Sequence, residues 1–228
     1  MSDFERLCVR VPKVYDWVTR QVDKDFNFMG TRGLDDLEFT CNGTPDADPC
    51  AFLEPGEDFI VNAIPTDQDG NQIDLDDIDC TEVGNRRNVY VEELGIELQA
   101  VKLKVQGYFV IELYMEDDLN NPFCVSTPIP FCVFEKFLLC APEGTDIECH
   151  IFDLFGTGVV CCNNGEFLDL AFTLTICQSV QVEADVKVEV EGKICQPRED
   201  IIEPIVDRLC PDIAFPPQCP EIFPPKNC

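Results

Sequence analysis

Apolar and polar residues alternate most regularly in the second half of the chain, over residues 101–191. From Val180 to Glu191 every second residue is valine or alanine, and the residues between them are polar or charged. Residues 168–176 carry leucine, phenylalanine or isoleucine at every second position. A strand directs successive side chains to opposite faces, so this pattern predicts antiparallel β-sheet with one packed face and one wet face.

Turn residues divide this half of the chain into long strands. The predicted strands lie near 101–115, 123–139, 147–160 and 167–191. Asn164-Gly165 is a strong signal for a two-residue hairpin turn, and Gln178-Ser179 is a point at which the last run could divide in two. We therefore expect an all-β fold, an antiparallel β-sandwich or a barrel-like domain with extended N- and C-terminal arms.

Residues 1–30 are expected to form the N-terminal arm. Val9 and Val11 alternate as in a strand, and Pro12 then interrupts the pattern. Four apolar residues after this proline would share one helix face, which allows at most a short helix near 13–21 (Val14, Trp17, Val18 and Val22). Whether the arm docks on its own domain or on a neighbour stays open.

Residues 31–85 form an acidic segment, in which the stretch from Gly33 to Asn85 contains no lysine or arginine. Short apolar pieces at 37–41 and 59–64 predict short strands joined by acidic loops. The sequence leaves open whether this segment and the β region of residues 86–195 form one domain or two.

Residues 196–228 end in a small tandem repeat. Cys210 and Cys219 each begin a unit that continues with proline, an acidic residue and isoleucine, and Cys228 follows the second unit. The prolines disfavour helix and central strand and favour an extended, polyproline-like chain. We expect a C-terminal arm with evenly spaced thiols.

The composition excludes two classes of partner. The chain has 228 residues, 45% of them hydrophobic, and a formal net charge of −28. A surface this negative repels nucleic acid and anionic membranes, so we expect neither as a partner. The same charge makes self-association costly unless another interaction offsets the repulsion.

The chain contains 15 cysteines, a density typical of an oxidising environment and a disulfide framework. Its first residues show neither the basic nor the apolar region of a secretion signal. We therefore expect synthesis in a cytoplasm and later exposure when the cell lyses. Because the count is odd, at least one thiol stays free or pairs between chains.

Several stretches resemble the SPOCS domain of spore-coat-associated, cysteine-rich proteins in endospore-forming bacteria. They are residues 102–114 (KLKVQGYFVIELY), 126–131 (STPIPF), 140–145 (CAPEGT) and the closing valine-rich strand 180–191. The opening at 8–22 is similar to the start of proteins of this type, so the resemblance covers 8–22 and about 101–195. It implies a non-catalytic role in the outer layers of the spore, with synthesis in the mother cell.

Few residues form a recognisable ligand or catalytic site. Asp67, Asp69 and Asn71 are calcium candidates, because hard cations take several converging oxygen ligands. A hairpin turn flanked by solvated acids explains the same residues. His150 has no partners at metal-ligand spacing and is expected to be an ordinary sheet residue. Cys161-Cys162 predicts one buried thiol and one exposed or bridged thiol, or else a strained vicinal disulfide.

These observations predict a structural protein of the spore surface, in the coat or exosporium. It would self-assemble into a layer or fibre through β contacts and inter-subunit disulfides, with copies of itself and other coat proteins as partners. We expect no enzyme activity, cofactor or metal. The candidate inter-subunit cysteines are Cys8, Cys210, Cys219 and Cys228, because extended arms reach furthest, although the tail could instead staple its own domain. The alternative function is an acidic, calcium-dependent binding or scaffold module that recruits other coat proteins.

Overall fold

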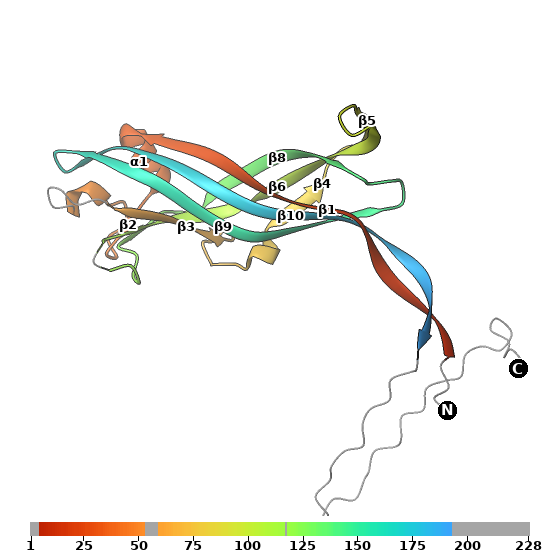
Figure 1. Cartoon of the computed structure of the whole chain (residues 1–228). Helices are drawn as coiled ribbons and strands as arrows, with labels where there is room; N and C mark the ends of the chain where they lie inside the picture. The colour runs from red at the N-terminus through yellow and green to blue at the C-terminus, as the bar shows by residue number, and fades with distance from the viewer. Residues whose placement is uncertain (1–4, 53–58, 117, 193–228) are drawn as a thin grey trace, which may run out of the picture. The chain divides into compact units, whose positions relative to one another are not determined.

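The computed structural model describes residues 5–52, 59–116 and 118–192 (Figure 1). The chain divides into two compact units, Cys8–Glu189 and a second one made of Met1–Leu7 and Val190–Cys228. The hydrophobic core belongs to the first unit. Among the described residues, no helix is long and apolar enough to cross a membrane.

The first sheet has three strands in the order β1, β10, β9. Their bounds are Glu5–Met29 for β1, Glu166–Gly192 for β10 and Asp146–Asn163 for β9. The turn Asn164-Gly165 joins β9 to its antiparallel neighbour β10, and both turn residues have positive φ, 55° and 79°. A type I′ hairpin turn requires positive φ at both central positions, and Asn-Gly adopts it readily. The predicted hairpin is confirmed.

Strand β10 continues past Gln178-Ser179 without dividing. Its register against β9 shifts between Cys177 and Gln178, as in a β-bulge, which changes the direction of side chains without ending a strand. Gln178 and Ser179 are both buried after the shift. The Ser179 hydroxyl accepts a hydrogen bond of 2.6 Å from the indole nitrogen of Trp17 on β1.

The second sheet is built on the long strand β6 (Ile96–Tyr114), which pairs antiparallel with β8 (Ile129–Leu139). Three further strands pair with successive parts of β6 on its other side: β5 (Arg87–Val91), β4 (Asp79–Glu82) and β3 (Ile60–Thr66). Two short strands extend the sheet. The strand β7 (Cys124–Val125) pairs with β6, and β2 (Thr40–Cys41) pairs with β7.

The acidic segment contributes directly to this second sheet. Strands β3 and β4 come from residues 31–85, whereas β6 and β8 come from residues 86–195. The two regions therefore share a sheet and its hydrogen bonds. The loops between these strands carry two 3₁₀ turns: η1 (Pro49–Phe52) and η2 (Leu75–Asp77).

The short helix that the sequence allows near 13–21 does not form, because this stretch belongs to strand β1. Contacts along β10 decide the conformation: Trp17 bonds Ser179, and Asp23 accepts a hydrogen bond of 2.9 Å from the Thr175 hydroxyl. Pro12 is tolerated because β1 lies at the edge of its sheet, where one side needs no donors. The helix of this region is instead α1 (Gly30–Leu37), directly after the strand.

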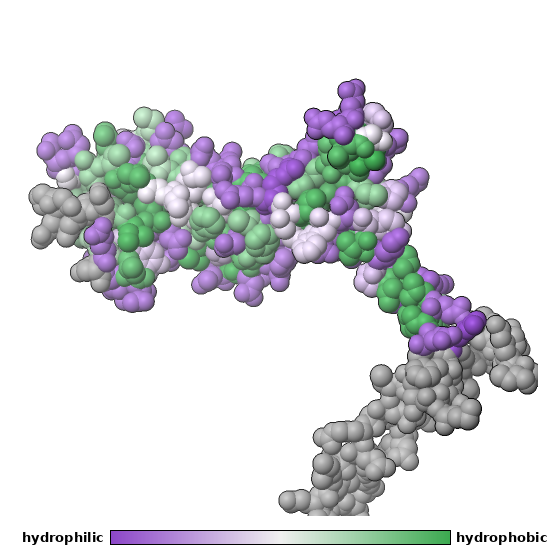
Figure 2. Space-filling model, in the orientation of Figure 1, coloured by the Kyte–Doolittle hydropathy of each residue, from purple (hydrophilic) through white to green (hydrophobic). Residues whose placement is uncertain are grey.

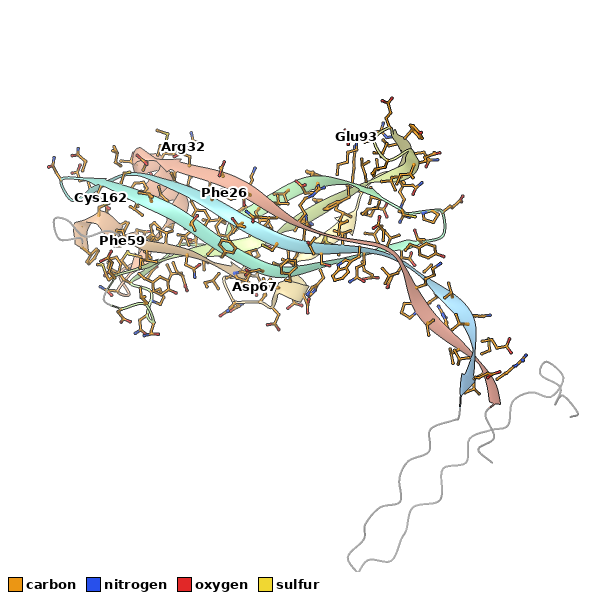
Figure 3. The ribbon with its side chains drawn as sticks, in the orientation of Figure 1. Phe26, Arg32, Phe59, Asp67, Glu93 and Cys162 are labelled. Atoms are coloured by element: carbon orange, nitrogen blue, oxygen red, sulfur yellow. A yellow bond between two sulfur atoms is a disulfide. The ribbon has the colours of Figure 1, made fainter. Side chains whose placement is uncertain are left out.

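Aromatic side chains fill the space between the two sheets. Phe26 of β1, labelled in Figure 3, packs edge-on against Phe109 of β6 with ring centroids 5.2 Å apart. Where the Phe172 ring packs on β9, glycine is required at position 156, because a Cβ there would overlap that ring and lie 2.8 Å from the Cβ of Ala63. The predicted all-β fold is confirmed: antiparallel sheets packed face to face, not closed into a barrel.

Candidate functional site

Six cysteines form three disulfides within the chain. They are Cys41–Cys124, Cys50–Cys162 and Cys80–Cys149, with Cα atoms 4.0, 5.7 and 6.0 Å apart. The last two connect the acidic segment to β9, and Cys80–Cys149 joins β4 of the second sheet to β9 of the first. Cys162 lies near the end of β9 (Figure 3). Each bridge closes a loop of 69 residues or more, and bridges of this kind contribute about 2–4 kcal/mol.

Thiols remain at Cys8, Cys132, Cys140 and Cys177. Cys8, Cys132 and Cys140 are exposed, and Cys177 is half-buried. Burial raises the pKa of the Cys177 thiol, and the neighbouring carboxylates of Asp153 and Asp23 add to the rise. A raised pKa keeps the thiol protonated and slow to react. The exposed thiols are therefore the ones available to another molecule.

The predicted inter-subunit cysteines are only partly placed. Cys8 is exposed on the edge strand β1, as its predicted role requires. Cys210, Cys219 and Cys228 lie outside the described residues, so their predicted role stays a prediction.

Sequence reasoning missed Cys132 and Cys140, the exposed thiols of the β8 region. The signal was present in the alternation itself: Phe131, Val133, Phe137 and Leu139 are buried, and the residues between them are more exposed. Cys132 and Cys140 both fall on the outward phase of this pattern. Assigning each cysteine to an inward or an outward position of the alternation would have predicted that Cys132 and Cys140 are exposed.

Both outer strands of the first sheet have an edge without a strand partner. In the described residues β1 and β9 each pair only with β10. Such edges present unpaired backbone N–H and C=O groups that can add a strand from another chain. The edge of β8 differs, because Arg20 donates to the Lys136 carbonyl at 2.9 Å and Asp16 accepts from the Cys140 amide at 2.8 Å.

Part of the first sheet continues as a two-stranded ribbon. β9 pairs with β10 only as far as Glu183, so β10 beyond this residue has β1 as its partner (Figure 1). Arg10 pairs with Asp185 across the ribbon, which places the half-buried Val9 and Val186 on the opposite face. Figure 2 shows apolar residues along this ribbon. Isolated two-stranded ribbons are marginally stable in water, so a partner covering this face would stabilise it.

The calcium candidates form a hydrogen-bonded turn. One carboxylate oxygen of Asp67 accepts from the backbone amides of Asp69 and Asn71 at 2.9 and 2.8 Å, and the other accepts from the Asn71 side chain at 2.8 Å. These bonds, the Asn71 side chain first, lower the pKa of Asp67. The carboxylate thus closes the turn. Within the described part of the chain, no group of three or more His, Cys, Asp or Glu is arranged to hold a metal ion.

The remaining candidates are structural. His150 lies on the surface of β9, with Nδ1 2.7 Å from an Asp76 carboxylate oxygen. Cys162 bonds to Cys50, so the strained vicinal bridge to Cys161 does not form.

Comparison with known proteins adds no relative. No family model matches the chain, and neither curated proteins nor solved structures give a match.

Proposed function

We propose that this chain is a non-catalytic structural protein of the endospore surface, which self-assembles into a layer or fibre through β contacts and inter-subunit disulfides. The observation that carries this proposal is the division of the cysteines. Six cysteines stabilise the core, whereas Cys8, Cys132 and Cys140 present thiols to the surroundings. Exposed thiols on a folded, disulfide-containing domain are positioned to join one chain to another.

Covalent bonds address the main obstacle to assembly, which is charge. With a formal net charge of −28 per chain, neighbouring copies repel one another at low ionic strength. A disulfide between chains holds the contact against this repulsion. Structural disulfides of low reduction potential also resist ordinary thiol pools, as a protective surface layer requires.

Strand edges provide the geometry that precedes the covalent bond. β1 and β9 each leave one edge without a strand partner among the described residues. An incoming strand from another copy, or from another coat protein, can continue the sheet at such an edge. The resemblance to SPOCS-domain proteins supports the same role and its location, with synthesis in the mother cell and exposure at lysis.

The test is the mass of the folded chain before and after thiol oxidation. The purified full-length protein is incubated with oxidised glutathione, which accepts the electrons of each new disulfide and is itself reduced to two glutathione molecules. Light scattering and non-reducing gels are expected to show covalent oligomers that reductant returns to monomers. A monodisperse monomer under both conditions would contradict the proposal and favour a binding or scaffold module.

A further inference from the structure

The outer face of the second sheet carries a basic patch, which is unusual on so acidic a chain. The patch consists of Lys102 and Lys104 on β6 and Lys136 on β8. Lys102 and Lys136 are directly paired across the two strands. Among the described residues, no salt bridge involves any of the three. Like charges directly opposite each other destabilise a sheet, so this pair carries a cost that its own chain does not offset.

Apolar side chains are exposed beside these lysines. Phe134, which pairs with Lys104, is 66% exposed, and Leu138 is 41% exposed. Asp79, which pairs with Gln106 at the margin of the patch, accepts a hydrogen bond of 2.6 Å from the Gln106 side chain. An exposed apolar and charged surface of this kind is typical of an interaction site.

The outer face of the first sheet has the opposite charge. Asp23 and Asp25 of β1 accept hydrogen bonds from the hydroxyls of Thr175 and Thr173 of β10, at 2.9 and 2.7 Å. Asp153 of β9 pairs in register with Cys177 of β10. These three carboxylates form an acidic patch around Cys177.

Two offsets along the strands are common to the two patches when each is counted from its cysteine, whereas Asp153, directly paired with Cys177, has no counterpart in the basic patch. On the second sheet, Cys132 pairs with Gln106. Lys104 follows two residues along β6, about 7 Å away, and Lys102 and Lys136 lie four residues away, about 13 Å. On the first sheet, Thr175 and Thr173, which hold Asp23 and Asp25, lie two and four residues from Cys177, again about 7 and 13 Å.

We infer that the basic patch of one copy docks on the acidic patch of a second copy of this chain. The inference rests on the proposed self-assembly and names the surfaces that perform it. The patches lie on the outward faces of two different sheets, so the contact is heterologous: each copy offers one face and receives another. Repetition of such a contact joins many subunits, in a ring where the rotation between copies closes and in an open chain where it does not. It also makes points of attachment of three lysines that form no salt bridge among the described residues.

Two charge-reversal variants test this arrangement, both in the full-length chain. The first is Lys104→Glu with Lys136→Glu, which makes the basic patch acidic. The second is Asp23→Lys with Asp25→Lys, which makes the acidic patch basic. A control with the same change in net charge as the first is Lys13→Glu with Lys187→Glu, both on strands of the first sheet. Circular dichroism verifies that each variant is folded.

Sedimentation velocity in about 0.1 M salt, without added oxidant, measures the association, because a Debye length of about 10 Å screens the long-range repulsion between chains and leaves direct charge contacts largely intact. The wild type and the control are expected to associate, and 1 M salt is expected to disperse them, because the Debye length falls to about 3 Å. Each reversed variant alone is expected to associate at least tenfold more weakly. An equimolar mixture of the two is expected to associate again, because each basic patch then meets an acidic one on the other chain.

The outcomes separate this inference from the proposed function. Unchanged association of either folded variant, or no recovery in the mixture, overturns the face-to-face contact. If the wild type still forms reductant-sensitive oligomers in that case, the proposed function stands and the contact lies elsewhere. A wild type that remains monomeric before and after oxidation overturns both, and leaves the basic patch to a different partner.

Discussion

Phe172 of β10 stacks on Phe109 of β6 across the interface between the two sheets, with ring centroids 5.5 Å apart and planes 12° apart. Both rings are buried. The pair fixes how the two sheets pack. The Phe172 ring lies against the backbone of β9 at Gly156, which has no side chain to hold the ring away. The outward faces that carry the thiols and charges depend on this packing.

Replacing Phe172 with alanine is expected to lower the free energy of unfolding by about 3–5 kcal/mol, because it removes buried surface and leaves a cavity. Urea denaturation followed by circular dichroism measures this change. Phe134→Ala is the matched control, since that ring is exposed and its removal is expected to cost far less. Equal losses for the two variants would contradict the assigned core.

The bridge between β4 and β9 is expected to stabilise the monomer. Cys80→Ser with Cys149→Ser should lower the free energy of unfolding by about 2–4 kcal/mol, since the 69-residue loop it closes becomes free in the unfolded state. The control, Cys132→Ser with Cys140→Ser, removes two thiols outside the bridges and should leave the free energy of unfolding nearly unchanged. A large loss in the second variant would show that these thiols belong to the core.

The thiols are expected to differ in reactivity. Iodoacetamide at neutral pH should modify Cys8, Cys132 and Cys140 well before Cys177. Cys177 is half-buried, and burial together with the Asp153 and Asp23 carboxylates raises its pKa. Peptide mass spectrometry over a time course measures the four rates. Modification of Cys177 at the rate of the exposed thiols would contradict its placement.

Stability is expected to fall at high pH through Tyr114. Burial first, then the hydrogen bond to Glu112 and the charge of that carboxylate, together raise the pKa of Tyr114 to about 12. The unfolded tyrosine titrates near a pKa of about 10. The raised pKa therefore contributes stability that is complete below pH ~10 and is lost as the pH approaches ~12. Tyr114→Phe should remove this part of the pH dependence in urea denaturation. If the variant and the wild type lose stability in parallel over this range, the interpretation is wrong.

The sequence predicts the sheets far better than it predicts their ends and pairings. Period two identified β10, and the Asn-Gly dipeptide identified the turn at 164–165, because both signals lie in adjacent residues of the chain. Period two failed at residues 13–21, where valines and Trp17 are compatible with either a helix or an edge strand, and contacts with Ser179 and Thr175 decide.

Pairing across long stretches of sequence was out of reach for a related reason. The alternation assigns Lys102 and Lys136 each to an outward phase, yet their position opposite each other depends on the register of β6 against β8. The disulfides of Cys50 and Cys80 likewise depend on which loops meet β9. The alternation of apolar and polar residues predicts which face of the sheet a side chain occupies, but it does not predict which residue of the next strand lies beside it.

The most direct test of the central claim is a non-reducing peptide map of assembled material made from equal amounts of ¹⁴N- and ¹⁵N-labelled full-length chains. Disulfide-linked peptides of mixed label come only from bonds between chains. The account predicts mixed labels for peptides containing Cys8, Cys132, Cys140 or the tail cysteines Cys210, Cys219 and Cys228. It predicts single labels for Cys41–Cys124, Cys50–Cys162 and Cys80–Cys149. An assembled sample in which every disulfide carries a single label would contradict the claim that bonds between chains hold the structure together.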